Sequence, residues 1–216
     1  MARRSYGQIC GVSRALEIVG ERWALLIVRD LLAGPKRFTD LRQGLPRIPT
    51  NVLSARLKEL EQAKVLQRRI LPRPATAVVY ELTEYGRELD DILIALGRWG
   101  VQSMEAPEPG DIYTASSLMM AMRAGYQTAV TESSKPTPAT YELHITDVVL
   151  GVTVKDGELD VTDGPPADPD LVIKTEHALA PLLMRRITPA EALESGDIQV
   201  VGNPELLTEF AHTFHW

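Results

Sequence analysis

Few side chains in this sequence could carry covalent or metal chemistry. Cys10 is the single cysteine, so the chain can form neither an internal disulfide nor a site with several thiolate ligands. His212 and His215 lie three residues apart and could share a helix face, but no carboxylate or third ligand accompanies them at a useful spacing. The sequence has no glycine-rich phosphate loop and no nucleophile with an evident base. It therefore predicts a protein that is not an enzyme and that has no cofactor or metal site.

Basic side chains are concentrated in the first part of the chain, where they could contact a polyanion. Residues 1–106 carry 17 lysines and arginines against 12 acids, for a charge of +5, and residues 107–216 carry 6 against 17, for −11. The excess reaches +9 in residues 1–80, although the whole chain has a net charge of −6. This division favours nucleic-acid binding by the first part. Two solvated surfaces of unlike sign are the alternative.

The apolar pattern of the first hundred residues predicts the elements that position these basic side chains. Apolar residues recur at helical spacing, and glycine or proline ends several of the runs. Two β-prone runs follow, and Thr83 is suited to cap the last helix. The order of helices, short helix, tight turn, helix and hairpin predicts a mainly α winged helix-turn-helix domain. The expected helices cover residues 9–19, 23–31, 38–42, 50–63 and 84–99, and the expected strands cover 66–71 and 77–82.

The helix expected at residues 50–63 has the pattern of a DNA-reading helix. With about 100° of rotation per residue, Leu53, Leu57 and Leu60 form a buried stripe. The opposite face is small and polar at its start and cationic further on, which suits contact with base edges and then with phosphates. An ordinary solvated helix face is the alternative. The predicted DNA contacts are Arg37, Arg47, Thr50, Asn51, Ser54, Ala55, Lys58 and Arg73.

Arg73 belongs to the wing expected at residues 72–76. It lies between two prolines at the hairpin tip, so the loop is stiff and its side chain could enter the minor groove. A solubilising charge on a turn is the alternative for this residue. Arg56 lies about 60° from the buried stripe, where it could contact DNA or pair with an acid inside the domain.

Four segments in this order carry a family resemblance: residues 24–32 (ALLIVRDLL), 37–41 (RFTDL), 52–60 (VLSARLKEL) and 79–86 (VYELTEYG). Together with a cysteine early in the first helix, they resemble the HxlR family of bacterial transcription regulators. The resemblance covers about residues 6–101. It implies a dimeric winged-helix repressor or activator whose terminal helices form the dimer interface. The apolar residues available for that interface are Ile9, Val12, Leu16, Leu89, Leu93, Leu96 and Trp99.

Cys10 has two interpretations. In some HxlR-like regulators the equivalent cysteine senses electrophiles or oxidants, and the nearby Arg3, Arg4 and Arg14 could favour its thiolate. The alternative is a small buried thiol that packs among Ile9, Val12 and the dimer partner.

Residues 106–111 (APEPGD) have the composition of a linker, so we expect domains at residues 1–106 and 113–216 with a linker at 107–112. After the linker, the pattern predicts a helix from residue 113 to about 126 and then an α+β arrangement. The expected strands cover residues 140–146, 148–154, 158–162, 171–175 and 198–201. Further helices are expected at residues 179–186, 189–195 and 204–214.

The closing run at residues 189–203 (PAEALESGDIQVVGN), with the strand at 170–173 and the helix that follows it, resembles the sterol carrier protein family. The resemblance implies a five-stranded sheet whose helices enclose an apolar tunnel for a lipid-like molecule. Flexible thioethers and aromatic rings adapt well to such a guest, although plain core packing is the alternative for each of them. The candidate pocket residues are Met119, Met122, Leu183, Phe210 and Phe214.

The whole sequence therefore predicts a dimeric bacterial regulator that binds near-palindromic double-stranded DNA and itself, and that responds to a lipid-like or aromatic ligand. One alternative is a thiol-sensing regulator that uses Cys10 and has a structural second domain; another is a lipid carrier. The longest apolar run is too short to cross a membrane, and the first residues lack the apolar segment of a secretory signal. We therefore expect a cytoplasmic protein with no membrane insertion.

Overall fold

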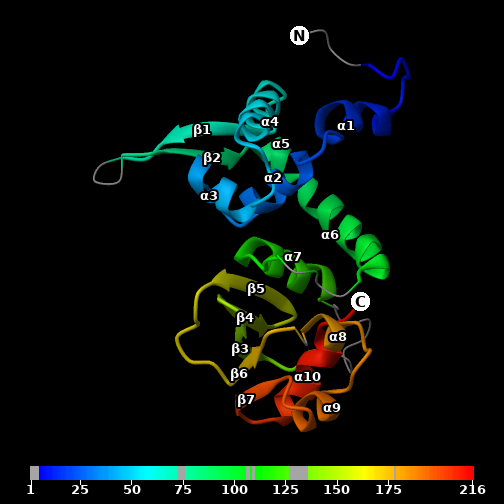
Figure 1. Ribbon diagram of the computed structural model, residues 1–216, viewed down its shortest axis with the longest axis vertical. Helices are drawn as coiled ribbons and strands as arrows, with labels where there is room; N and C mark the ends of the chain where they lie inside the picture. Colours follow the sequence, from blue (N-terminus) through cyan, green and yellow to red (C-terminus); the bar gives the residue numbers. More distant parts are fainter. Residues whose placement is uncertain (1–4, 73–75, 106–107, 109, 127–135, 178) are drawn as a thin grey trace. The chain divides into compact units, whose positions relative to one another are not determined.

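The computed structural model describes residues 5–72, 76–105, 108, 110–126, 136–177 and 179–216 (Figure 1). The chain forms two compact units, Met1–Leu93 and Ile94–Trp216, which divide within helix α6 (Leu89–Gly100). The domain limits expected from composition, at residues 106 and 113, stay a prediction. Within the described ranges, no helix is both long and apolar enough to cross a bilayer.

The N-terminal unit has the predicted order of elements. Its helices lie close to the expected positions, and the fourth helix is followed by a two-stranded hairpin, as in a winged helix-turn-helix (Figure 1). The elements before α6 are α1 (Gly11–Val19), α2 (Ala24–Leu32), α3 (Phe38–Gly44), α4 (Thr50–Gln62), β1 (Leu66–Ile70), β2 (Val78–Leu82) and α5 (Glu84–Arg87).

The core of this unit is built from one apolar stripe on each helix. Leu53, Leu57 and Leu60 of α4 are all buried, which confirms the predicted stripe, and α2 contributes Ile27 and Leu31. Burial of such a side chain stabilises the fold by about 1.5–3 kcal/mol. α4 contacts α1 and β1, while α2 contacts α3 and β2, so the core joins these helices to the hairpin.

The start of α3 is capped, and the turn from α3 to α4 buries apolar side chains. The backbone N–H of Arg37 donates to the Asp40 carboxylate at 2.8 Å, which caps the start of α3. Leu45 and Ile48 are buried within the turn, and Pro49 stands directly before α4. Proline suits this place because a helix start leaves its N–H groups without intrahelical partners.

The hairpin is antiparallel, with Leu66 opposite Leu82 and Ile70 opposite Val78. Lys36 adds a single bridge to Tyr80 on the other side of β2.

The chain after the hairpin differs in one respect from the sequence prediction. Thr83 caps a helix as expected, since its hydroxyl accepts from the Gly86 N–H at 3.1 Å. The expected single helix is nevertheless divided at Glu88 into α5 and α6.

The C-terminal unit contains the predicted five-stranded mixed sheet, in the order β5-β4-β3-β6-β7. β3 and β6 pair in parallel, with Tyr141 opposite Leu171, and the other neighbours are antiparallel. The strands are β3 (Ala139–Ile145), β4 (Val148–Lys155), β5 (Glu158–Asp163), β6 (Leu171–Thr175) and β7 (Gln199–Gly202). The helices after α6 are α7 (Ala115–Gly125), α8 (Leu179–Leu183), α9 (Pro189–Glu194) and α10 (Glu205–Thr213).

Alternation along the strands separates the buried face of this sheet from the more exposed face. Tyr141, Leu143 and Ile145 of β3 are buried, while the residues between them are only partly buried. The rings of Tyr141 and Phe210 meet edge to face with centroids 5.1 Å apart, so α10 packs on the buried face.

Candidate nucleic-acid interface

The exposed face of α4 carries most of the predicted DNA contacts. Thr50, Asn51, Ser54, Ala55 and Lys58 are all exposed, and Asn51, Ala55 and Lys58 lie opposite the buried leucine stripe. The Ser54 hydroxyl donates to the Thr50 carbonyl at 2.9 Å, so its oxygen still has lone pairs for another donor. The face is therefore small and polar near the start of the helix and basic one turn later.

The other predicted contacts lie outside this helix. Arg37 is exposed just before α3, and Arg47 is exposed in the turn between α3 and α4. Arg73 lies outside the described residues, so its contact with the minor groove stays a prediction. Arg56 points elsewhere, because it pairs with Glu59 and, at 3.6 Å, with Glu21. Of the two alternatives for Arg56, the structure shows the pairing with acids inside the domain.

A groove with a volume of about 480 Å³ lies between α4 and the hairpin, beside Phe38 of α3. Ser54, Lys58 and Glu61 line its α4 side, and Arg68 and Tyr80 line its hairpin side. We call this space the α4–hairpin groove. The sequence pattern did not predict it, because the groove depends on how the hairpin packs against α4.

Two arginines of the hairpin form ion pairs on opposite faces of the strand. Arg68 binds Glu61 of α4 at 2.8 Å, and Arg69 binds Glu81 of the neighbouring strand, also at 2.8 Å. The hydrogen bonds that Arg68 donates to Glu61 raise the pKa of Arg68, whereas those that Glu81 accepts from Arg69 and then Gln67 lower the pKa of Glu81. The sequence pattern does not identify the partner of either arginine, because both pairs depend on how the hairpin packs.

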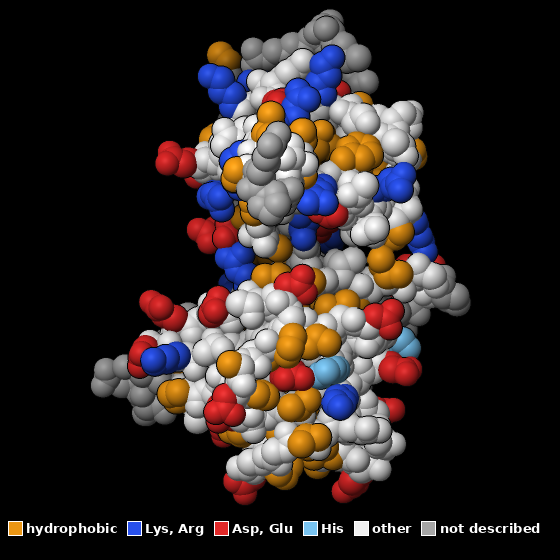
Figure 2. Space-filling model, turned by 90° about the vertical axis from the view of Figure 1, so that its left-hand side faces the viewer, with side chains coloured by type: hydrophobic (Ala, Val, Ile, Leu, Met, Phe, Trp, Pro, Cys, Tyr) orange, Lys and Arg blue, Asp and Glu red, His pale blue; other side chains and the backbone are white. Residues whose placement is uncertain are grey.

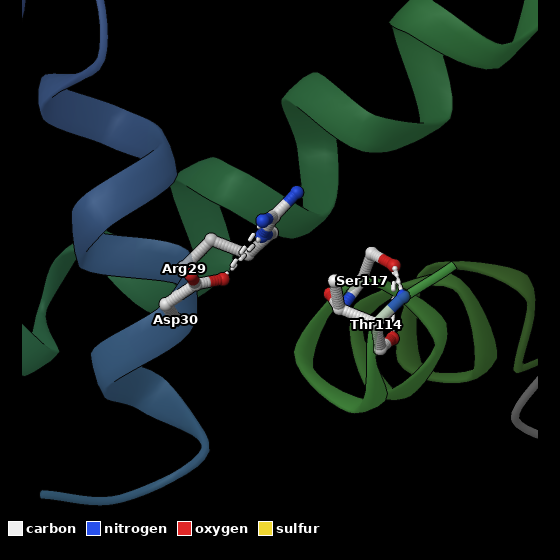
Figure 3. A network of polar contacts seen from close by, with 4 residues as sticks. All are labelled: Arg29, Asp30, Thr114 and Ser117. Carbon is white, nitrogen blue, oxygen red and sulfur yellow. Dashed lines mark hydrogen bonds and ion pairs between the residues drawn. The ribbon is translucent and has the colours of Figure 1, made fainter. Parts of the chain in front are cut away.

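A buried carboxylate of α2 lies against the end of α3. Asp30 of α2 is only 1% exposed, and Arg29 donates two hydrogen bonds to one of its oxygens, at 2.8 and 3.0 Å (Figure 3). Burial raises the pKa of Asp30, while the charge of Arg29 offsets part of that effect. A Cβ on Gly44, the last residue of α3, would lie 2.8 Å from the other Asp30 oxygen. Asp30 and the end of α3 are thus closely packed.

The basic and acidic side chains are distributed between the units as the charge count predicts. Figure 2 shows mostly lysine and arginine over the N-terminal unit and mostly aspartate and glutamate over the C-terminal unit, on the face drawn. A positive surface around α4 attracts phosphate groups over a distance set by the salt concentration.

Cys10 is an exposed thiol at the N-cap of α1. The backbone N–H groups of Ser13 and then Val12, at the start of the helix, lower its pKa, because a helix N-terminus favours an anion. Arg14 donates to Glu17 at 3.0 Å, and Arg3 and Arg4 lie outside the described residues. Among the described residues, the helix start and not an arginine lowers the pKa of Cys10.

The candidate pocket residues of the C-terminal unit meet in one apolar cluster. Met122, Leu183, Phe210 and Phe214 are fully buried and Met119 is partly buried. The Phe210 and Phe214 ring centroids are 4.8 Å apart. A guest molecule would therefore have to move side chains that are packed together in this structure.

The aromatic side chains beside this cluster include a buried hydroxyl that the sequence pattern did not single out. Tyr126 directly follows α7 and packs on Phe214, with ring centroids 5.8 Å apart. Its hydroxyl is buried and has no hydrogen-bond partner among the described residues.

The start of α7 is fixed by a capping box, in which Thr114 and Ser117 each accept a hydrogen bond from the other's backbone N–H (Figure 3).

No group of three or more metal-binding side chains occurs in the part of the chain that the structure describes. The Nδ1 atom of His215 lies 3.0 Å from the backbone carbonyl of His212, and burial lowers the pKa of His215.

Comparison with known proteins identifies both parts of the chain. A family model described as HxlR-like helix-turn-helix matches residues 18–108. The HTH-type transcriptional regulator YodB of Bacillus subtilis (strain 168) is 39% identical over 97 residues, which are 45% of this chain and 84% of YodB. The chain belongs to the HxlR family. It is an HxlR-family helix-turn-helix transcriptional regulator, and its C-terminal part matches the SCP-2 sterol transfer family over residues 121–215.

A further regulator and two solved structures of YodB show a similar level of identity to this chain. The uncharacterized regulator Rv3095 of Mycobacterium tuberculosis (strain ATCC 25618 / H37Rv) is 40% identical over 97 residues, which are 45% of this chain and 61% of Rv3095. A solved structure of reduced B. subtilis YodB is 37% identical, covering 48% of this chain and all of that chain, with a TM-score of 0.40. A second solved structure, of quinone-bound B. subtilis YodB, is 34% identical. It covers 42% of this chain and 96% of the YodB chain, with a TM-score of 0.37.

Proposed function

We propose that this HxlR-family regulator binds a near-palindromic DNA operator as a homodimer, with α4 of each protomer in the major groove. The observation that carries the proposal is the exposed face of α4, from Thr50 to Lys58, on a helix whose opposite side is fixed by the buried leucine stripe. Two such helices should read half-sites about 34 Å apart, one turn of the duplex. The regulator would act on bacterial DNA in the cytoplasm.

The proposed dimer uses the exposed apolar residues of α1 and α6. Ile9, Val12 and Leu16 are exposed at the first helix, and Ile92, Leu96 and Trp99 are exposed on α6. Leu93, which the sequence analysis also assigned to this surface, is buried within the chain instead. Exposed apolar side chains gathered on two helices favour association across a two-fold axis.

Selection from a random DNA pool with the purified protein tests operator binding. Fluorescence anisotropy on the selected duplex should give an affinity that falls steeply with salt, because each phosphate contact releases counterions. Lys58→Ala should weaken binding, whereas Lys155→Ala, which removes an exposed lysine from the acidic C-terminal unit, should leave it unchanged. Equal affinity of both variants would refute the assignment of α4. Binding of apolar ligands with no DNA binding would favour a lipid carrier.

Light scattering after size-exclusion chromatography tests the dimer. Ile9→Glu should give monomers at micromolar concentration, because it places a charge in the proposed interface. Ile112→Glu is the matched control, since Ile112 is also exposed but belongs to neither α1 nor α6. A monomeric wild-type protein would contradict the proposal.

We also propose that a lipid-like or aromatic ligand binds among Met119, Met122, Leu183, Phe210 and Phe214 and changes operator affinity. The support is the match to the SCP-2 family together with the gathering of these side chains in one cluster. Mass spectrometry of the denatured, purified protein would identify a co-purified ligand. That ligand should raise the melting temperature and shift the DNA-binding curve over the same concentration range. If candidate ligands change neither quantity, the C-terminal unit has a structural role.

Thiol sensing through Cys10 is the second candidate function. It is favoured by the exposure of the thiol and by the hydrogen bonds that lower its pKa. A quinone-bound form of the relative YodB has also been solved. Treatment with a quinone should lower the DNA affinity of the wild-type protein and leave that of Cys10→Ser unchanged. The same loss in both proteins would exclude this candidate.

A further inference from the structure

The α4–hairpin groove contains a doubly hydrogen-bonded ion pair between the two elements that a winged helix-turn-helix presents to DNA. The Nε atom of Arg68 donates to one carboxylate oxygen of Glu61 at 2.8 Å, and Nη2 donates to the other at 2.9 Å. Glu61 belongs to the last turn of α4 and Arg68 to the middle of β1. The pair therefore holds a hairpin side chain against the DNA-reading helix.

This pairing leaves part of the Arg68 guanidinium for another acceptor. A guanidinium has five N–H donors, and Glu61 receives two of those of Arg68. The Arg68 side chain is 57% exposed, so its other edge is accessible from the solvent. Lys58, one turn before Glu61 on α4, lines the same groove. Two cations and one carboxylate give the groove a net charge of +1.

The neighbouring arginine is arranged differently, although it is also exposed and paired. Successive residues of a strand point to opposite faces, so Arg69 is directed away from the face that Arg68 shares with Tyr80. Arg69 is 46% exposed, and its Nε atom donates to Glu81, at 2.8 Å. It does not line the groove. Arg69 is thus a matched control for Arg68.

The geometry of B-form DNA indicates what the groove would meet. One sugar–phosphate strand separates each major groove from the adjacent minor groove. If α4 lies in the major groove and the hairpin reaches the neighbouring minor groove, that strand must pass between α4 and the hairpin. The space between them is the α4–hairpin groove.

We propose that the α4–hairpin groove is a DNA-phosphate site in which Lys58 and Arg68 contact the backbone and Glu61 positions Arg68. This inference rests on the proposed DNA binding and assigns a further contact to it. Because Glu61 already orders the Arg68 side chain, little conformational entropy is lost when a phosphate binds. The negative charge of Glu61 also weakens the attraction of the groove for phosphates that do not reach the free edge of the Arg68 guanidinium. Glu61 is therefore a positioning residue that increases discrimination between operator and random DNA.

Anisotropy titrations on the selected operator and on a random-sequence duplex, between about 50 and 200 mM salt, test the inference. Arg68→Ala should lower operator affinity roughly tenfold and reduce the salt slope by about 0.9 per bound protomer. Arg69→Ala should keep the wild-type slope. Glu61→Gln should bind random DNA more tightly and lose discrimination. Arg68→Lys keeps the charge but loses the doubly bonded pair, so it should retain the salt slope while discrimination falls.

Each outcome separates this inference from the proposed function. Circular dichroism spectra check that the variants fold. If Arg68→Ala does not fold, Arg68→Lys still tests the ion pair, because it keeps the positive charge and most of the side chain. If wild-type protein binds DNA with a salt-dependent affinity but Arg68→Ala and Arg69→Ala have the same slope, the phosphate site is wrong and DNA binding stands. Unchanged discrimination in Glu61→Gln would overturn the positioning role. If wild-type protein binds no DNA, both proposals fail.

Discussion

Gly86 lies in α5 at the point where this helix passes the base of the hairpin, and its replacement by alanine should strongly destabilise the N-terminal unit. A Cβ at this position would lie 1.9 Å from the Val65 carbonyl oxygen. An ordinary contact begins near 3.4 Å, so the two segments would have to separate by 1.5 Å. Hydrogen bonds from the Thr83 N–H to Val65, at 3.1 Å, and from the Thr83 hydroxyl to Lys64, at 2.6 Å, oppose that movement.

The expected cost follows from these contacts. Separation of the segments weakens both bonds of Thr83 and the one it accepts from Gly86, each worth about 1 kcal/mol. Overpacking adds about 1–3 kcal/mol, and the higher helix propensity of alanine returns up to about 1 kcal/mol. A net loss of about 3 kcal/mol would lower the melting temperature of a unit of this size by roughly 12–24 °C.

Urea unfolding followed by circular dichroism measures this loss. Gly100→Ala is the control, because Gly100 has a helical φ of −67° and a Cβ there meets nothing within 4 Å. The control should be neutral or should gain about 0.4–1 kcal/mol. If Gly86→Ala unfolds within about 0.5 kcal/mol of the wild-type protein, the contact with Val65 does not constrain the fold as we argue.

Further predictions follow from two buried titratable groups and from the thiol. Because burial raises the pKa of Asp30 in the folded state, its contribution to stability is largest below pH 3.8 and declines as the pH rises through the folded pKa. The stability of wild-type protein relative to Asp30→Asn, from urea unfolding, should therefore fall between acid and neutral pH. Burial, with smaller effects from Glu209 and Asp170, raises the pKa of Tyr141 to about 12. An ultraviolet titration of the tyrosines should therefore show a phenol that ionises near pH 12 in the wild-type protein, and this step should be absent from Tyr141→Phe. Iodoacetamide should alkylate Cys10 at neutral pH, and Ser13→Pro, which removes a backbone donor, should slow that reaction.

The periodic elements could be predicted from the sequence because local spacing determines them. The leucine stripe of α4 recurs at helical intervals, so its buried side and the opposite exposed side follow from the pattern. The cap at Thr83 was also predictable, since a threonine before an apolar run satisfies the first N–H groups of a helix.

Features that depend on packing between elements could not be predicted in this way. Apolar residues surround much of α6, so spacing alone does not tell that Leu93 is buried while Leu96 and Trp99 are exposed. The Glu61–Arg68 pair requires the position of the hairpin beside α4, which the sequence of neither element specifies. The division at Glu88 likewise follows from no local signal that we can identify.

The order of strands in the C-terminal sheet has a consequence for synthesis of the chain. β3 acquires its parallel neighbour β6 only about 30 residues later, and β7 completes the edge at Gly202, about 120 residues after the hairpin ends at Leu82. At about 5–20 residues per second, the ribosome needs roughly 6–24 s for that interval. The hairpin pairs strands that are close in sequence, and such local contacts form quickly. The DNA-binding fold should therefore be complete while Tyr141, Leu143 and Ile145 still expose an unfinished apolar face, which makes the nascent C-terminal unit the part that chaperones would engage.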